Sequence, residues 1–387
     1  MKEVVLLAGT RSEAVKIAPV ALALGDHPVL RPVIVHSGQR NGMVEQALSA
    51  FGLLVDVEPA VPRATGGQAE LLARLVAEFD RLLRGRDPAV VLVPGDTTTA
   101  LAGALAAFWR GTPVAHLAAG LPTGDVAGPF PEEGARRMIA RIATLHLVPT
   151  DDDAAALVRE GMGDRRIVVT GNTVVDAVQR IAAADLPARD PDLAVLERVL
   201  DERSERLVLV TAHRRESWGK PLTRVLHAVR AIADRHPDVR VLLPVHPDPR
   251  VRAAARAVLG GHERIVVTGP LDYSDLVRAL RRSSLVLTDS GGIQEGAPTF
   301  GVPVLVLRDT TERVSAVEAG GAWLVGTDPI RIIAEAGWVL GARLRLPRGR
   351  NPFGDGRAAI RVRGALERLV GLPSDFAGAP LPLRIPC

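Results

Sequence analysis

Short, continuous apolar segments separated by helical patterns constrain the fold of this chain more than any other feature. Each segment is rich in Val and Leu and ends at a turn before a helical stretch begins. Apolar residues at every position, rather than at alternate positions, are typical of parallel strands buried on both faces. Strands that alternate with helices predict doubly wound parallel sheets. The predicted strands span 3–8, 30–36, 89–94, 113–117, 145–149 and 166–170, and then 206–211, 239–245, 264–268, 284–288, 303–307 and 322–325.

These strands form two sets, which indicates two Rossmann-like domains. Residues 183–204 separate the sets, are polar and carry no strand pattern, so we interpret them as the connection, with one short helix. We predict an N-terminal domain over 1–182 and a C-terminal domain over 183–356. A C-terminal helical segment, about 357–387, is expected to pack back on the first domain. Because open α/β sheets bind ligands at the carboxyl ends of their strands, we expect the domains to face each other across a ligand cleft.

Composition excludes several classes of protein. The single cysteine, Cys387, rules out a disulfide framework and a cysteine-ligated zinc site, and we expect no metal. The net charge is +4, with basic and acidic residues interleaved, so nothing predicts nucleic-acid binding. No stretch approaches the ~20 apolar residues that cross a bilayer, and the first residues show no leader pattern. We expect a cytoplasmic protein without a membrane partner.

Polar clusters follow three strands of the first half. Arg11 follows a Gly-Thr turn and Lys16 lies one turn later on a helix, a placement that favours anions. Asp96 follows the strand 89–94 and either faces a ligand or caps the next helix. Glu132 and Glu133 end a Gly/Pro-rich loop and either supply a catalytic carboxylate or complement the dipole of the helix that follows.

The second half carries a comparable set. His213 and Arg214 follow the first strand, and His246 follows the second. Ser290, Gly291 and Gly292 interrupt the chain between a strand and a helix, where bared amides and the helix N-terminus suit a diphosphate. Neither GxGxxG nor GxxxxGK[ST] occurs, so NAD and P-loop nucleotides lose support. Together, these loops indicate a nucleotide sugar or another phosphorylated ligand.

The chain resembles the non-hydrolysing UDP-N-acetylglucosamine 2-epimerases in motifs spread over nearly its whole length. This resemblance implies two Rossmann-like domains of the glycosyltransferase-B type. The matching stretches are GTRSEAVKIAPV (9–20), GDTTTA (95–100), PFPEE (129–133), TGNTVVDA (170–177), TAHRRES (211–217), PVHPDP (244–249), LTDSGGIQEGAP (287–298), PVLVLRDTTER (303–313), LVGTD (324–328) and NPFGDG (351–356).

The resemblance also implies an activity. Such enzymes interconvert UDP-GlcNAc and UDP-ManNAc by eliminating UDP to a 2-acetamidoglucal and adding it back, without a cofactor, and are typically homodimers. By family match, Asp96, Glu132 and His213 are the candidate acid/base or orienting groups. The expected substrate grip consists of Arg11, Lys16, His213, Ser290, Gly291, Gly292, Glu295 and Arg313. A regulatory UDP-sugar site would involve Gln39, Glu133, Arg214 and His246.

The chain departs from the family pattern at several site positions. Ala118 stands where the family has a catalytic glutamate, and Pro122 replaces a neighbouring arginine. Gly296 replaces a glutamate that contacts the ribose. Other departures are Ser12, Ala135 and the pair Val314-Ser315. Two alternatives to epimerisation therefore stay open: hydrolytic cleavage of a nucleotide sugar, which releases UDP and free sugar, and binding of a nucleotide sugar without catalysis.

Overall fold

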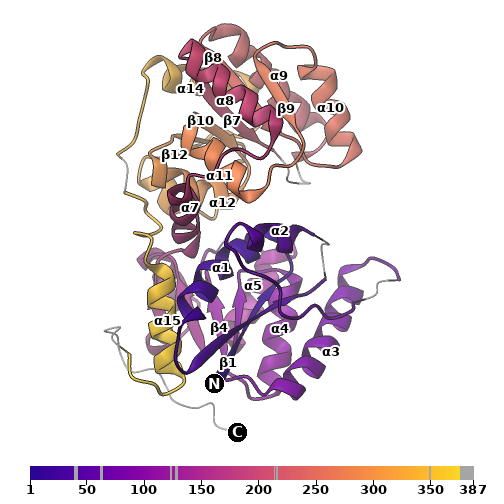
Figure 1. The fold of residues 1–387 in the computed structure, drawn as a ribbon, viewed down its shortest axis with the longest axis vertical. Coiled ribbons are helices and arrows are strands. Elements are labelled where there is room, and N and C mark those ends of the chain that lie inside the picture. The colour runs from indigo at the N-terminus through magenta and orange to yellow at the C-terminus, as the bar shows by residue number, and fades with distance from the viewer. Residues whose placement is uncertain are drawn as a thin grey trace. The chain divides into compact units, whose positions relative to one another are not determined.

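The computed structural model describes residues 1–38, 42–61, 64–122, 124–126, 130–212, 214, 217–347 and 350–374. The chain divides into two compact units (Figure 1). Unit 1 contains Met1–Ala177 and Phe353–Cys387, and unit 2 contains Val178–Pro352. The division falls inside one helix, α7 (Thr173–Ala184), at residue 177 rather than at the predicted 182.

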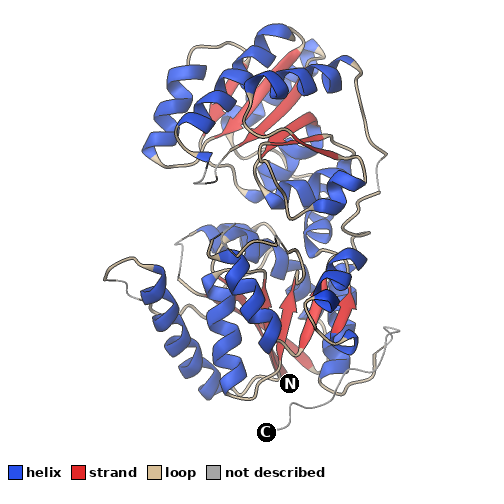
Figure 2. Cartoon of the chain, turned by 180° about the vertical axis from the view of Figure 1, so that it is seen from behind, coloured by secondary structure: helices blue, strands red, loops and turns tan. Residues whose placement is uncertain are grey.

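Unit 1 is built on a six-stranded parallel sheet with the order β2-β1-β3-β4-β5-β6. Helices lie on both sides of the strands (Figure 2). The strands are β1 (Lys2–Ala8), β2 (Leu30–His36), β3 (Val90–Pro94), β4 (Val114–Leu117), β5 (Leu145–Val148) and β6 (Ile167–Val169). The helices are α1 (Arg11–Gly25), α2 (Met43–Ser49), α3 (Gln68–Arg86), α4 (Thr98–Trp109), α5 (Glu132–Ile142), α6 (Asp151–Arg159), the short η1 (Asp164–Arg166), α7 and α15 (Ala358–Leu369).

Unit 2 repeats this plan with the strand order β12-β11-β10-β7-β8-β9, again fully parallel. The strands are β7 (Arg206–Thr211), β8 (Val239–Pro244), β9 (Ile265–Thr268), β10 (Ser283–Thr288), β11 (Val304–Val306) and β12 (Ala322–Leu324). The helices are α8 (Pro191–Arg203), α9 (Lys220–Arg235), α10 (Pro249–Leu259), α11 (Tyr273–Arg282), α12 (Gly291–Gly296), the short η3 (Ala297–Phe300), α13 (Val314–Glu318) and α14 (Pro329–Gly341). All twelve predicted strands are present, which confirms the predicted doubly wound α/β class.

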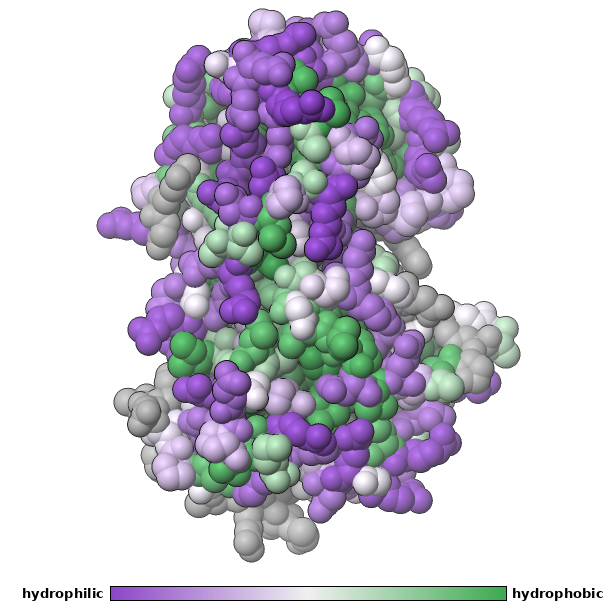
Figure 3. All heavy atoms as spheres, in the orientation of Figure 1, coloured by the Kyte–Doolittle hydropathy of each residue, from purple (hydrophilic) through white to green (hydrophobic). Residues whose placement is uncertain are grey.

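The strands form because they are largely apolar and buried, although β1 starts at the exposed Lys2 and the edge strands β2 and β6 also carry exposed residues. Every residue of β3 is buried, as is every residue of β4. In unit 2, residues from β7, β8, β10 and β11 join one core with the inner faces of α9 and α14. Hydrophilic residues cover most of the face of unit 2 shown in Figure 3.

The stretch 183–204 is more ordered than the predicted connection. Asp190 caps α8 by accepting hydrogen bonds from the amides of Asp192 and Leu193. Leu193, Leu196 and Leu200 are buried and bind the helix to unit 2. The three leucines recur at helical spacing, a pattern that the mostly polar composition of the segment hides. The segment therefore belongs to unit 2 and is not a linker.

The C-terminal helix α15 packs against α1 within unit 1. Its N-terminus is held by Asp176 of α7, whose carboxylate accepts hydrogen bonds from the amides of Ala358 and Ala359. In the segment that leads into α15, the carbonyl of Phe353 accepts a hydrogen bond from the amide of Asn172. Residues 375–387 lie outside the described part of the chain. Within the described part, we find no helix with the length and apolarity that crossing a bilayer requires.

Candidate functional site

The sheet topology of each unit points to one place at its edge. In unit 1 the chain leaves β1 toward β2 but leaves β3 toward β4, so the connections from these adjacent strands run in opposite directions. In unit 2 the same reversal occurs between β7 and β10. Such switch points open a crevice at the carboxyl ends of the two strands, where doubly wound proteins bind ligands. The loops after β1, β3, β7 and β10 carry most of the predicted site residues.

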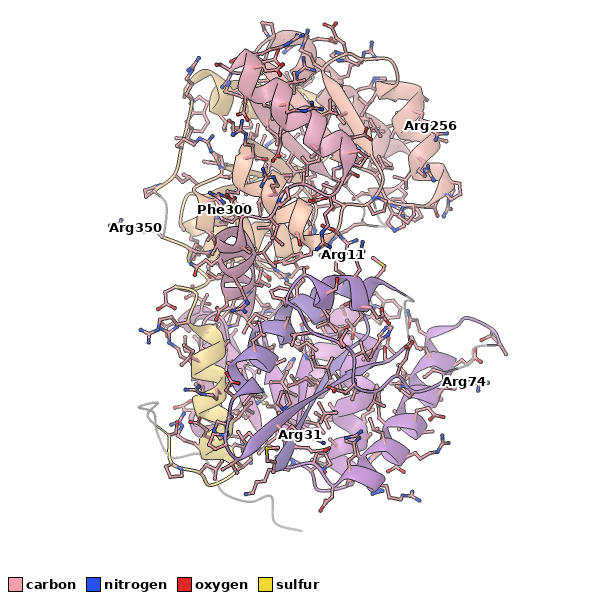
Figure 4. The ribbon with its side chains drawn as sticks, viewed as in Figure 1. Arg11, Arg31, Arg74, Arg256, Phe300 and Arg350 are labelled. Atoms are coloured by element: carbon pink, nitrogen blue, oxygen red, sulfur yellow. The ribbon has the colours of Figure 1, made fainter. Side chains whose placement is uncertain are left out.

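Arg11 and Lys16 lie on the helix that follows β1. Arg11 is the first residue of α1, and its side chain is labelled in Figure 4. Thr10 is the N-cap of this helix and accepts a hydrogen bond from the amide of Glu13. Lys16 is buried one turn further along. A positive helix end with two added cationic side chains favours an anionic ligand.

Asp96 lies in the turn between β3 and α4. Gly95 has a φ of 68°, a conformation that favours glycine, and turns the chain sharply at this point. The N-cap of α4 is Thr97, whose hydroxyl accepts from the amide of Ala100. Capping of α4 by Asp96, one of the two functions considered from sequence, is therefore wrong. The half-buried Asp96 side chain is available for another function.

Glu132 and Glu133 begin α5, but their environments differ. Glu132 is half-buried at the first position of the helix. Glu133 is buried, and its carboxylate accepts from Arg136 at 2.8 and 2.9 Å and from Arg137 at 2.7 Å. Two arginines therefore already neutralise Glu133, whereas Glu132 remains the better candidate for proton transfer.

Ala118 directly follows β4 and has a φ of 54°, an uncommon backbone conformation for a residue other than glycine. It is buried, and the loop that it starts is fixed where the amide of Leu121 donates to the carboxylate of Asp153. The fold therefore keeps the turn at this position although the chain has lost the glutamate side chain that the resemblance predicts.

In unit 2, Ser290 is the N-cap of α12, and Gly291 and Gly292 form its first turn. The preceding residue, Asp289, is buried, and its carboxylate accepts from the amide of Arg214 at 2.8 Å. The Arg214 guanidinium also donates to the Asp289 carbonyl at 3.0 Å. Asp289 thus links the loop after β7 to the loop after β10, at the switch point of this sheet.

Arg313 is held by two acidic residues beside the same turn. Its guanidinium donates to the fully buried Glu295 at 2.9 Å and to Glu312 at 3.0 Å. Despite its burial, Glu312 has a pKa well below the ordinary value because Arg308 and Arg313 stabilise its anion. A side chain on Gly291 would collide with Arg313, since an added Cβ would lie 2.5 Å from Cζ. The structure thus brings Glu295, Gly291 and Arg313 together.

His246 follows β8, and its ring lies 5.3 Å from the ring of Trp218. The guanidinium of Arg250 lies over the ring of Trp218, with its Cζ 4.9 Å from the ring centroid. The remaining predicted site residues, Gln39 and His213, fall outside the described residues, so their roles stay predictions. The motifs assign no role to Glu13, Thr97 or Asp289, which the structure places at the switch points. Only Glu13 leaves a signal in the sequence, a capping box with Thr10.

Comparison with known proteins agrees with these features. A family model described as UDP-N-acetylglucosamine 2-epimerase matches residues 22–367. The UDP-N-acetylglucosamine 2-epimerase of Escherichia coli (strain K12) is 39% identical over 381 residues, which cover 94% of this chain and 98% of that protein. The enzyme of the same name from Yersinia pestis is 39% identical over 370 residues and is covered to 98%.

Two solved structures are similar along nearly their whole length. The UDP-GlcNAc 2-epimerase from Neisseria meningitidis, bound to UDP-GlcNAc, is 33% identical with a TM-score of 0.86, covering 94% of this chain and 99% of that chain. The S. aureus protein MnaA, in a structure with UDP, is 35% identical with a TM-score of 0.88, covering 97% and 100%. The chain therefore belongs to the UDP-N-acetylglucosamine 2-epimerase family.

Proposed function

We propose that this enzyme interconverts UDP-GlcNAc and UDP-ManNAc, or a close analogue of this pair, by elimination and re-addition of UDP. One observation carries the proposal: a relative bound to UDP-GlcNAc shares the fold over nearly the full chain. At the switch points, this chain also has anion-binding groups and carboxylates. The ManNAc product and the mechanism are the parts of the proposal that experiment must decide.

The chemistry requires a base, an acid and a stabilised leaving group. In the first step the C1–O bond breaks, UDP leaves with the electron pair, and a base takes the C2 proton, which gives the 2-acetamidoglucal. In the second step a proton is added to the opposite face of C2 while a UDP oxygen bonds to C1. Positioned acid/base groups contribute typically ~10²–10⁴-fold. We assign proton transfer to Asp96 and Glu132, with His213 as a third acid/base or orienting group.

The leaving diphosphate needs positive charge and amide dipoles. We assign this task to the amides of Gly291 and Gly292, the Ser290 N-cap and Arg313. Arg11 and Lys16 add cations on unit 1. Because Glu295 pairs with Arg313, its proposed contribution to substrate binding is to fix the guanidinium.

We also propose that the protein is a cytoplasmic homodimer in cell-surface or antibiotic sugar biosynthesis. Helices α4 and α5 expose Phe108, Trp109 and Met138, and exposed apolar side chains of this size support an interface. Light scattering at micromolar concentration tests the dimer. A regulatory UDP-sugar site at Gln39, Glu133, Arg214 and His246 stays part of the proposal, although Glu133 and Arg214 already have protein partners.

Ala118 favours a second candidate function. If the missing glutamate is the group that returns a proton to C2, the glucal intermediate escapes, and the reaction ends as cleavage of the nucleotide sugar with release of UDP. Gly296 also removes a ribose contact. A Cβ at this position would lie 3.2 Å from Val178 Cγ1, so neighbouring apolar atoms now occupy part of that space.

Incubation with UDP-GlcNAc in deuterium oxide tests both candidates. Epimerisation predicts deuterium at C2 and the appearance of UDP-ManNAc, whereas net cleavage predicts accumulating UDP and free sugar or glucal. Ala118→Glu is the matched variant: under net cleavage it should raise epimerisation by ~10²-fold, the lower range for one acid/base group. Saturable UDP binding in calorimetry with no turnover would instead show a nucleotide-sugar binder without catalysis.

A further inference from the structure

Glu13 is a buried carboxylate at the switch point of unit 1, with 2% of its surface exposed. Its Oε2 accepts from the amide of Gly9 and the hydroxyl of Thr10, both at 2.9 Å. Its Oε1 accepts from the hydroxyl of Thr97 at 2.5 Å. The first two donors belong to the turn after β1, and the third belongs to the turn after β3.

This arrangement exceeds what a helix cap requires. The contacts that resemble the capping box of α1 are local: the Thr10 hydroxyl accepts from the amide of Glu13, and the Glu13 carboxylate accepts from the amide of Gly9. Thr97 is the N-cap of a different helix, α4, so one carboxylate joins two helix N-termini across the switch point. Glu70 provides a contrast at the start of α3, because its carboxylate accepts from its own preceding loop, at Ala64, Thr65 and Gly66, and from Arg74 of its own helix, but joins no second helix N-terminus among the described residues.

We propose that Glu13 is a positioning residue that couples the Arg11 turn to the Asp96 turn and so sets the distance between the cation and the carboxylate of the catalytic edge. The proposal rests on the proposed function. Arg11 and Asp96 are each one residue removed from a threonine that donates to Glu13. Moving either threonine would therefore move the neighbouring side chain.

The coupling depends on the charge of Glu13. The anion accepts from all three donors as they stand, whereas a protonated carboxyl carries an O–H donor, so that one threonine hydroxyl must turn around or lose its hydrogen bond. Burial is the main reason that the pKa of Glu13 is raised to about 7; the hydrogen bonds from Thr97, Gly9 and Thr10 oppose the rise and the charge of Asp96 adds to it. Protonation below about pH 7 should therefore release one turn and lower activity.

The other charged groups at this edge come from the neighbouring elements. Arg11 and Lys16 lie on α1 itself, and Asp96 lies on the β3–α4 turn. After β3 comes β4, whose buried His116 has its pKa lowered to about 3 by burial and stays neutral over the working range. On the other side, β2 ends at His36, which faces Glu45 at 2.9 Å and Glu58 at 3.5 Å.

The test compares Glu13→Gln with wild type. The amide resembles the protonated carboxyl, so kcat should fall about tenfold, equivalent to ~1.4 kcal/mol of barrier. Between pH 6 and 8 the wild-type kcat should rise with pH, and the variant should lose this rise. Thr97→Val should lower kcat in the same way while Glu13 stays in place, whereas Thr97→Ser, which keeps the hydroxyl, should have the kcat of wild type.

Glu70→Gln is the matched control, since it removes a capping carboxylate in the same unit and should leave the pH profile of kcat unchanged. An unaltered pH profile in Glu13→Gln, or wild-type kcat in Thr97→Val, overturns the coupling. A separate readout needs no turnover. Because the folded-state pKa is raised above the unfolded value, wild-type stability relative to Glu13→Gln should decline as pH rises from about 4.5 to 7. Absence of that decline also overturns the proposal, whereas a lack of wild-type turnover contradicts only the proposed function.

Discussion

Gly291 and Gly292 are adjacent in α12 but leave very different space for a side chain. A Cβ at Gly291 would lie 2.5 Å from Arg313 Cζ, while a Cβ at Gly292 would meet no heavy atom within 4 Å. In Gly291→Ala the guanidinium must move away from Glu295, which is fully buried and would lose its cation. A buried polar group deprived of its partner costs ~1–3 kcal/mol, so this variant should melt earlier and bind UDP more weakly.

Gly292→Ala is the matched variant for stability. Because alanine favours a helix more than glycine does, the melting temperature of this variant should stay level or rise. The gain in the free energy of unfolding should be at most ~1 kcal/mol. Differential scanning fluorimetry of both variants, without and with UDP, makes the comparison. Equal melting temperatures for the two variants would show that the contact between Gly291 and Arg313 contributes nothing.

The sequence predicts the residue types of the site better than their pairing. Two adjacent glycines after a buried strand predict a diphosphate seat, since bared amides are a local property. By contrast, the pairing of Arg313 with Glu295 joins different elements across 18 positions, and no spacing rule encodes it. For the same reason Glu133, predicted to bind a regulatory ligand, could not be seen from sequence to carry two arginines.

At the scale of elements, strands were predictable because continuous burial leaves a direct pattern in the sequence. Helix α8 was harder, because its three buried leucines are outnumbered by charged residues that face solvent. The link between α1 and α4 through Glu13 and Thr97 was not predictable, since it depends on β1 and β3 being neighbours in the sheet. Strand order follows from the packing of the whole unit and not from any one segment.

A substitution of Arg136 tests which contacts fix the first turn of helix α5. The Arg136 side chain is only 4% exposed and donates both to Glu133 and to Glu160 of the α6 C-cap. Arg136→Met keeps the volume but removes one of the two arginines that pair with Glu133, which is 1% exposed. Breaking a buried ion pair costs ~3–5 kcal/mol, so the free energy of unfolding of unit 1, measured in urea, should fall by an amount of that order.

Arg141→Met is the control for that substitution, because Arg141 lies on the same helix and, among the described residues, donates only to the Glu160 carbonyl at the end of α6. It should cost less than ~1 kcal/mol. An Arg136→Met protein that unfolds at the wild-type urea concentration would show that Arg137 alone compensates the charge of Glu133.

At the scale of the whole molecule, the two units have separate cores and need not unfold together, so a single unfolding free energy does not describe the chain. The units can be followed separately because three of the four tryptophans, Trp218, Trp323 and Trp338, belong to unit 2. Intrinsic fluorescence therefore reports mainly on unit 2, and circular dichroism reports on both units.

Acid should weaken unit 1 through a pair of buried histidines. His116 of β4 and His146 of β5 occupy facing positions, with ring centroids 6.2 Å apart. Both ring nitrogen atoms of His146 lack a hydrogen-bond partner among the described residues. Burial lowers the pKa of His146 to about 4 and that of His116 to about 3. Below pH 6.5 these histidines therefore bind protons in the unfolded chain but not in the folded unit, and the stability of unit 1 falls as the pH falls toward 4.

His146→Leu removes this penalty with a side chain of similar size. Each histidine contributes ~1.4 kcal/mol per pH unit, so at pH 5 the variant should gain ~2 kcal/mol over wild type, and much less at pH 8. Urea unfolding followed by circular dichroism at the two pH values measures the gain, and the fluorescence transition of unit 2 should not move. His262→Leu, which removes the ion-pair partner of the exposed Asp234 in unit 2, should show no such gain at pH 5. An equal change at pH 5 and pH 8 would mean that His146 stabilises unit 1 through packing alone, and the acid weakness would then have to arise elsewhere in the unit.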